Sequence, residues 1–521
     1  MAGPTPGITS HDRPGTTPGF AKGPGSGDVR HVRGTVVRVS VESDDATSPG
    51  AGREGAIATW LQTPRGRVRV RTSTLSQVPT GSTVDAEVRE NAPTSPQEPD
   101  TTGDAAAAAE RGGSVVAATV TAAASKEPAL AAAVHDVTVV LVLPPGTSAD
   151  RTTPGQLAAA VNGSVSSFWS VQTGGRVRFR AVRTVNWLRV RSRCDDAWGL
   201  WSEVSRRVGY RPGPRRHLLV LVPPSVEGCY AGLGTIGATS DAGGYAYVRG
   251  TLTGLVAHEL GHNMGLGHSN GLQCARTSDG VWNGDWTAGC VRTGYRDWYD
   301  VMGVSWDHLG TLSTAQAYRL GALPTGSVTT ISRPTRVTLT AVGLHDGLRS
   351  LRVTDPGGGT YVVEYRGAVG ADAWLAKNWR GLRAGVLIRR DDPEGDPGQT
   401  LLLDGSPSAA SRYSLDWDEP VVVGRSLTTG DGRVVVRVEG QTPTAAEVSV
   451  EIDGVRPASG LARLGSRLAD DTSSRVVRDP TLALPPSPGT SPRPTSSVSA
   501  PVSAGPEPDV RERGRFSTPA R

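Results

Sequence analysis

The sequence predicts a mixed α/β domain in the middle of the chain, with a small β-rich domain before it and an all-β sandwich domain after it. Strand-like and helix-like segments alternate from residue 135 to 324, which is typical of an α/β layer. Residues 325–453 contain many short alternating runs separated by Gly, Asp and Pro, as in β-sandwiches. Residues 28–90 alternate apolar and polar side chains with period two, which indicates half-buried strands.

The other segments have the composition of linkers and tails. The chain of 521 residues contains 66 glycines and 38 prolines. Its length favours several folded units, and segments rich in Gly, Pro, Ser and Thr cannot bury enough apolar surface to fold alone. We therefore expect a disordered N-terminus at 1–27, a linker at 91–134 and a disordered Pro/Ser-rich tail at 454–521.

The α/β domain has recognisable strands and helices. The apolar run from Val137 to Pro144 predicts a strand that is buried on both faces. A helix is expected from Pro154 to about Val171, because a proline stands in its first turn and two glycines follow its end. Further along, the patterns predict a strand, a helix and another strand, at 176–182, 195–209 and 217–223.

Charge and hydropathy exclude two classes of function. The net charge is only +5, and no basic stripe interleaved with aromatic residues is visible, so nucleic-acid binding is not expected. No run of about 18 or more apolar residues occurs, so no membrane span is expected. The first residues lack the apolar core of a secretion signal.

The cysteines indicate an oxidising compartment. All four, Cys194, Cys229, Cys274 and Cys290, lie within one domain. An even number confined in this way favours two disulfides and an extracellular, secreted protein, although buried free thiols are the alternative. We expect the pairs Cys194–Cys229 and Cys274–Cys290, of which the second closes a short loop.

The segment "HELGHNMGLGH" carries three of the nine histidines. Apolar residues at helical spacing around it, among them Leu255 and Leu260, predict that His258 and His262 lie on one face of a helix. Residues i and i+4 are roughly 6 Å apart along a helix axis, close enough for both imidazoles to bind one ion.

A third imidazole and a carboxylate complete the pattern. Gly265 can take a positive φ, end the helix and turn the chain so that His268 becomes a third ligand. Three imidazoles leave one tetrahedral position on Zn²⁺ for water, which is the layout of a catalytic site, whereas structural zinc sites favour thiolates and four protein ligands. Glu259, next to the first histidine, would be the general base that takes a proton from this water.

The spacing H-E-x-x-H-x-x-G-x-x-H resembles that of the metzincin clan of zinc peptidases, and within it the gametolysin family. The resemblance rests on "AHELGHNMGLGHS", the "YDVMG" turn around Met302, the following "LGTLSTAQAYRLGAL" and the earlier "SSFWSVQTGGRVRF". It covers about residues 135–450. It implies a metzincin-like zinc peptidase domain, made of a mixed sheet and an active-site helix, in a secreted zinc endopeptidase with one catalytic ion. Met302 would then pack beneath the metal without binding it.

The sequence departs from part of the clan's pattern. Val304 stands two residues after Met302, so a tyrosine ligand of the astacin type is not expected. Stabilisation of the oxyanion then falls mainly to the zinc, with Tyr295, Tyr299 or His308 as candidate helpers.

Further expectations concern substrate and partners. A protein or peptide substrate would bind extended in a cleft along an exposed strand edge, for which Cys229 to Thr239 is the candidate, and the chain would be a monomer. The acidic stretch from Arg389 to Asp404 could bind Ca²⁺, although a solvated loop is the alternative. Two other functions stay open: a catalytically weak surface-binding protein and a zinc amidase that acts on peptidoglycan peptides.

The N-terminal segment is a candidate propeptide. Some metzincins are kept latent by a propeptide cysteine on the zinc, but residues 1–193 contain no cysteine. If residues 28–90 are inhibitory, they must block the cleft sterically or offer an oxygen or imidazole ligand. Asp44, Asp45 and His31 are the candidates.

Overall fold

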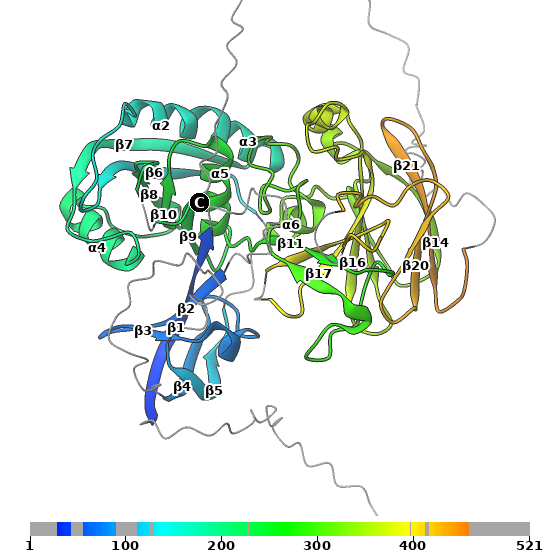
Figure 1. Cartoon of the computed structure of the whole chain (residues 1–521), viewed down its shortest axis with the longest axis horizontal. Helices are drawn as coiled ribbons and strands as arrows, with labels where there is room; N and C mark the ends of the chain where they lie inside the picture. The colour runs from blue at the N-terminus through cyan, green and yellow to red at the C-terminus, as the bar shows by residue number, and fades with distance from the viewer. Residues whose placement is uncertain are drawn as a thin grey trace, which may run out of the picture. The chain divides into compact units, whose positions relative to one another are not determined.

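The described residues fall into three β-sheets, and helices pack on the first of them (Figure 1). The structure, a computed structural model, describes residues 29–42, 56–89, 112–124, 130–226, 229–395, 398–411 and 416–457. All of these belong to one unit, Met1–Leu464. The disordered segment expected at 1–27 and most of the tail expected at 454–521 lie outside the described residues. No helix of the described part is long and apolar enough to cross a membrane.

The first sheet has ten strands and is mixed. Its strands β6, β7, β8 and β10 are parallel, whereas β9 runs antiparallel to β10. The main order is β3 (Gly66–Val70), β2 (Ala56–Thr63), β1 (Val29–Glu42), β9 (Gly232–Ile236), β10 (Gly244–Arg249), β8 (Arg216–Val222), β6 (Ala133–Leu143) and β7 (Val177–Arg189). In addition, β4 (Thr83–Arg89) pairs with β1, and β5 (Ser114–Ala122) pairs with β4.

Helices cover both faces of this sheet. Alternate residues of β6, β8 and β10 pack in one core with α2, α3 and α5, and the intervening residues pack in another core with α4. Thr153 caps α2 in a capping box with Gln156, which explains why the helix starts there. The helical segments are α2 (Pro154–Ala160), the π-turn η3 (Val161–Val165), α3 (Ser166–Gln172), α4 (Ala197–Val208) and α5 (Thr253–Asn263).

The N-terminal strands are joined to the first sheet through β1. Strands β1 to β5 enclose a small core of their own, with Val36, Leu61 and Val84 fully buried. The end of β1 also pairs with β9, so one continuous sheet runs from the N-terminal strands into the α/β layer. Strand β5 lies within 91–134, where a linker was expected, because its β-branched residues pair antiparallel with β4.

The second half of the chain builds the other two sheets. The seven-stranded sheet takes two strands from before residue 324, so it begins earlier in the chain than the sandwich expected at 325–453. Its order is β12 (Val291–Thr293), β11 (Ser269–Gln273), β18 (Thr400–Leu403), β17 (Gly385–Asp391), β16 (Thr360–Arg366), β15 (Ser350–Thr354) and β13 (Val328–Ile331). The four-stranded sheet is β14 (Thr335–Thr340), β21 (Ala445–Ile452), β20 (Val434–Gln441) and β19 (Ser426–Thr428).

Short helical segments and two disulfides complete the described structure. The cysteines pair as Cys194–Cys229 and Cys274–Cys290, which is the pairing that we expected. The remaining helical segments are η2 (Thr72–Leu75), η4 (Thr287–Gly289), α6 (Thr314–Arg319), η5 (Val342–Leu344) and η6 (Gly370–Ala376).

A buried ion-pair cluster ties the second half to the segment before α6. Arg389 of β17 lies 2.6 Å from Asp297 and 2.8 Å from Glu364, and all three side chains are fully buried. The guanidinium and the two carboxylates stabilise one another, because a buried ion without an oppositely charged partner would lose its hydration without compensation.

Replacing Arg389 should therefore destabilise the fold strongly. Arg389→Met leaves two buried carboxylates without this partner and should lower the free energy of unfolding by about 3–5 kcal/mol in urea denaturation. Arg433→Met removes an arginine from an exposed pair with Asp453 and serves as the control, with little expected change. Equal denaturation midpoints for the two variants would contradict a structural role for the buried cluster.

Candidate metal centre

Helix α5 holds His258 and His262 one turn apart in the interior of the first sheet's layer. Every residue from Gly254 to Asn263 is buried, and two glycines allow neighbouring segments to approach the helix. A Cβ at Gly254 would lie 2.2 Å from the Trp306 carbonyl oxygen, and one at Gly261 would lie 2.6 Å from the Met302 sulfur. The helix is thus fixed on all sides by close packing.

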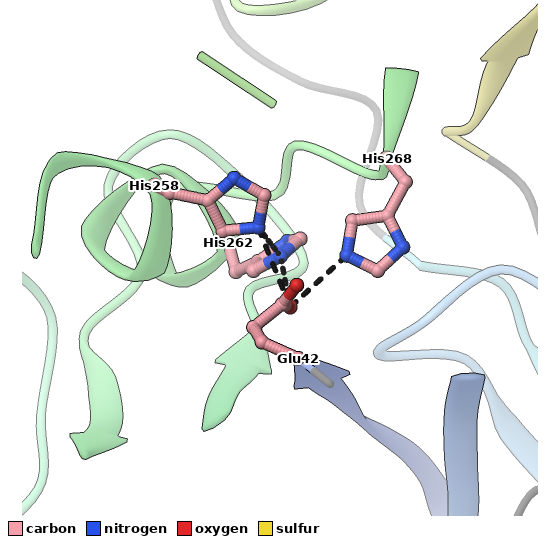
Figure 2. A group of neighbouring side chains, drawn as sticks. All are labelled: Glu42, His258, His262 and His268. Carbon is pink, nitrogen blue, oxygen red and sulfur yellow. Dashed lines mark hydrogen bonds and ion pairs between the residues drawn. The ribbon is translucent and has the colours of Figure 1, made fainter. Parts of the chain in front are cut away.

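A tight turn brings the third histidine to the same place. Gly265 has a φ of +93°, and its amide donates to the carbonyl of His262 at 2.8 Å. Such a φ is accessible to glycine without a steric penalty. The chain then reverses, and His268 enters the site directly before β11, as Figure 2 shows.

Two imidazole rings are oriented by backbone carbonyls. The Nδ1 of His258 donates to the Val301 carbonyl at 2.6 Å, and the Nδ1 of His262 donates to the Leu266 carbonyl at 2.8 Å. Because a carbonyl can only accept, each neutral ring carries its proton on Nδ1 and presents a bare Nε2 lone pair. These two Nε2 atoms face each other at 2.9 Å.

Glu42 is the fourth group at this point, and it comes from the end of β1 (Figure 2). Its Oε1 lies 3.3 Å from the Nε2 of His258, 3.3 Å from that of His262 and 3.1 Å from that of His268. All four side chains are fully buried, and their donor atoms lie within 4.8 Å of one another. This group can hold a metal ion.

The spacing of the donor atoms fits a tetrahedral zinc ion. With metal–ligand bonds of about 2.0–2.1 Å, neighbouring ligands of a tetrahedron lie about 3.3 Å apart. The distances from Glu42 to the three imidazoles, 3.1–3.3 Å, are close to this length, and the Nε2 atoms of His258 and His262 lie somewhat closer, at 2.9 Å. Lone pairs that converge on one point without a proton between them repel, so the arrangement calls for a cation. The residues present therefore fit Zn²⁺.

Burial sets the protonation states around the site. It lowers the pKa of His262 to about 3 and also lowers the pKa of His268, which keeps both imidazoles neutral and able to bind metal. Burial alone would raise the pKa of Glu42, but His268 and His258 outweigh this effect and hold it well below the usual value. Glu42 is thus a carboxylate, which is the form that binds metal.

Glu259 lies in the same interior with both carboxylate oxygens unpaired among the described residues. Burial and the nearby charge of Glu42 raise its pKa well above the usual value. Two glycines of β9 make room for it, since a Cβ at Gly232 would lie 2.0 Å from one oxygen and a Cβ at Gly234 would lie 2.6 Å from the other. A buried carboxylate without a partner is costly, so its presence points to a chemical role.

Met302 lies under the helix that carries the histidines. Its side chain is fully buried and its sulfur packs against Gly261. Asp300 fixes the turn by accepting hydrogen bonds from the amides of Met302 at 2.8 Å and Ser313 at 2.9 Å. The Met302 carbonyl accepts from the amide of Ser269, which joins the turn to the segment that follows His268.

Of the three candidate helper residues, Tyr295 is the one beside the histidines. Its ring centroid lies 4.4 Å from that of His268, and its hydroxyl donates to the carbonyl of Val41 at 2.9 Å. Burial raises its pKa well above the usual value, so the hydroxyl remains a donor. Tyr299 instead donates to the Arg383 carbonyl, and the ring of His308 stacks on Trp374.

Sequence reasoning did not find Glu42 or its neighbour Ser40. Of the ligands considered for the N-terminal segment, Asp44 and Asp45 lie outside the described residues. His31 pairs with Glu87 at 3.6 Å, and its side chain is exposed, so it is not at the metal centre. The only sequence signal was a group of acidic residues at the end of a predicted strand.

The proposed Ca²⁺ site between Arg389 and Asp404 gains no support. Among the described residues, the group around Glu42 is the one cluster of metal-ligating side chains found. Asp392 pairs with Arg292 at 2.6 Å, and Asp404 accepts a hydrogen bond from Ser411. These carboxylates therefore have partners within the protein.

A polar chain behind the metal centre fixes β9 against α5. The Nδ1 of His217 lies 2.9 Å from the side-chain oxygen of Asn263, and the Asn263 amide donates to the Thr235 carbonyl at 2.8 Å. His135 continues the chain, with its Nδ1 2.9 Å from the Nε2 of His217. Burial lowers the pKa of His217 to about 4.

This shift predicts a pH dependence of stability. Because the pKa of His217 is about 4 in the folded chain against 6.5 unfolded, acid favours the unfolded state. Its contribution, roughly 3 kcal/mol, is present above pH 6.5 and is lost as the pH falls toward 4. The free energy of unfolding of His217→Gln should therefore fall less between pH 7 and pH 4 than that of the wild type. An unchanged slope in His217→Gln, matching the exposed-site control His31→Gln, would contradict this.

Removing a ligand should weaken metal retention. His268→Ala deletes one of the three imidazoles and should lower zinc affinity by more than about 100-fold, since loss of a mere supporting hydrogen bond already costs 10–100-fold. Competition with a chromophoric chelator measures this, with His31→Ala as the control. Wild-type retention in His268→Ala would show that the ion is bound elsewhere.

The comparisons with known proteins give no family. No protein-family model matches the chain, and no curated protein matches it. Among solved structures, wild-type OgpA from Akkermansia muciniphila is similar at 14% identity with a TM-score of 0.24, over 46% of this chain and 73% of that chain.

Two further structures resemble the chain at a similar level. A catalytically inactive OgpA in complex with an O-glycopeptide substrate, glycodrosocin, has 12% identity and a TM-score of 0.23 over 46% of this chain and 73% of that chain. A chaperone–substrate complex has 14% identity and a TM-score of 0.19 over 40% of this chain and 39% of that chain. At such low TM-scores the likeness decides nothing about the activity of this chain.

Proposed function

We propose that the protein is a zinc-dependent endopeptidase of the metzincin type, similar to the gametolysin family. The observation that carries the proposal is the convergence of three buried imidazoles, from His258, His262 and His268, beside the unpaired carboxylate of Glu259. The position of Met302 under the helix of the ligands supports it. The two disulfides are consistent with an extracellular protein, and we extend the proposal to secreted or cell-wall protein substrates.

The chain's own residues divide the work of peptide hydrolysis. When bound, zinc acidifies water and polarises the scissile carbonyl. Glu259 accepts the proton of the attacking water and donates it to the leaving amine, which completes hydrolysis with no net change in the enzyme. Its pKa, raised by burial, suits a group that must both take and give a proton near neutral pH.

The substrate would bind as an additional strand on β9. This strand is paired on one side with β10 and on the other with the end of β1, so the edge that we expected to be exposed is covered in the structure. It passes directly beside Glu259, as the two glycines at 232 and 234 show. An antiparallel peptide on this edge would gain backbone hydrogen bonds and pass by the metal centre. Tyr295, which donates to a backbone carbonyl here, would donate to the carbonyl of the substrate in the same way.

Two other functions remain alternatives to this one. Binding to a surface would not require an unpaired, buried carboxylate next to the ligands. The unpaired carboxylate oxygens of Glu259 therefore favour an enzyme. A zinc amidase acting on peptidoglycan peptides would share the metal centre. Parallel assays on a peptide library and on purified cell wall distinguish the endopeptidase from the amidase.

Removing the base should slow turnover by orders of magnitude and leave the metal bound. Glu259→Gln keeps the shape of the side chain but cannot take a proton, so kcat/KM should fall by about 10²–10⁴-fold. Mass-spectrometric profiling of cleavages in a peptide library, with zinc content measured on the same samples, gives both readouts. The control is Glu447→Gln, which changes a half-exposed glutamate that pairs with Arg336. Normal turnover by zinc-loaded Glu259→Gln would disprove the mechanism.

A further inference from the structure

The last residues of β1 occupy the edge of β9 that the substrate would need. Arg38 to Glu42 pair antiparallel with Ile236 to Gly232, and the amide of Ala231 donates to the carbonyl of Glu42 at 2.9 Å. In Figure 1 the blue β1 arrow runs from the N-terminal strands to β9, next to α5. A second strand cannot pair with this edge while β1 is there, because each strand edge offers one row of hydrogen-bonding groups.

One face of this segment points at the metal centre. Glu42 offers its Oε1 to all three imidazoles, within 3.3 Å of each. The hydroxyl of Ser40 donates to the same oxygen at 2.6 Å and lies 2.7 Å from the Nε2 of His268. A carboxylate in this position fills the fourth tetrahedral place, which an active site needs for water.

The other face of the segment is buried in the apolar core around α4. Val39 is 1% exposed and Val41 is 3% exposed, and both pack in the cluster that contains Leu233 and the Cys194–Cys229 disulfide. Alternation along the strand thus sends Ser40 and Glu42 to the metal and the two valines to the core. The segment is held as firmly as a strand of the sheet itself.

Aromatic contacts anchor the rest of the N-terminal strands nearby. Trp60 of β2 meets Trp198 of α4 edge to face, with ring centroids 5.8 Å apart. The guanidinium of Arg67, on β3, lies 3.8 Å above the ring of Trp198.

The backbone of β1 also takes up a hydrogen bond that we assign to the substrate. The hydroxyl of Tyr295 donates to the carbonyl of Val41, although in the proposed function it would donate to a substrate carbonyl. Each of these contacts must break before a substrate can enter.

We propose that β1 is a tethered occupant of the substrate-binding edge, with Glu42 as the fourth ligand of the metal, and that the intact chain is therefore latent. The inference rests on the proposed function, because it assigns the regulation of that site. The occupant is a segment of this chain, and its chemistry is that of an extended peptide with a metal-binding carboxylate.

The topology also limits where the chain must be cut for activation. Strand β5 pairs with β4 and belongs with the N-terminal strands, whereas β6 is a central strand of the α/β layer. A cut before Ser114 would leave β5 attached to the α/β layer while it pairs with the strands that have to leave. The cut that frees β1 to β5 together falls between Ala122 and Ala133.

The experiment uses the full chain with a recognition sequence for a site-specific protease in place of residues 125–129. The probe is a peptidyl hydroxamate, which needs both the metal and the β9 edge, and its affinity is measured by calorimetry before and after cutting. The intact chain should bind the hydroxamate at least tenfold more weakly than the cut chain from which the N-terminal fragment has been removed. The rate at which a chelator removes zinc should rise in parallel, because Glu42 no longer covers the ion.

Variants of the uncut chain test the ligand itself. Glu42→Gln weakens the bond to the metal but leaves β1 paired with β9, so the probe here is acetohydroxamate, which needs the metal alone. The uncut Glu42→Gln chain should bind it at least tenfold more tightly than the uncut wild type. Glu87→Gln, a change of the same kind in β4 away from the centre, should bind it as the wild type does. Equal affinities of Glu42→Gln and Glu87→Gln, or of the intact and cut wild-type chains, would overturn the inference.

The result also separates this inference from the proposed function. If the cut protein binds one hydroxamate per zinc but cleaves no peptide in a library, the inference that β1 occupies the β9 edge is supported and the proposed endopeptidase function is wrong. Cut protein that cleaves peptides no faster than the intact chain, with equal hydroxamate affinity, would support the endopeptidase and overturn latency.

Discussion

The burial of one carboxylate among three imidazoles is the interaction on which the rest of the structure depends. Glu42 and the three histidines are fully buried and bring four donor atoms to one point. Four donor atoms buried together lose their hydration, and a bound cation would offset this loss. A bound metal would turn the same four groups into a cross-link between β1 and α5.

The surrounding scaffold keeps these groups in register. Small residues, above all Gly232, Gly234 and Gly261, let the Glu259 carboxyl group, β9 and the turn at Met302 pack closely around α5. The chain from His217 through Asn263 to Thr235 then fixes β9 relative to α5. The proposed substrate edge, the proposed base and the candidate metal ligands therefore depend on one rigid unit, and the proposed peptide hydrolysis would need such a unit for orientation.

Much of this arrangement could be predicted from the sequence, because its signals are local. The spacing of His258, His262 and His268 predicts a helix and a turn. In the structure the three side chains lie together in one group that could hold a metal ion. Glu42 could not be found in this way, since it lies more than 200 residues away and nothing in its own surroundings distinguishes it from a solvated acid. The pairing of β1 with β9 and of β11 with β18 is also long-range, and local periodicity carries no information on it.

The most direct test of the account is to locate the metal in crystals of the intact chain by anomalous diffraction on both sides of the zinc absorption edge. The account predicts one strong anomalous peak, coordinated by the Nε2 atoms of His258, His262 and His268 and by a carboxylate oxygen of Glu42. A zinc peak elsewhere, or a zinc ion at the three histidines with water in the place of Glu42, would contradict it.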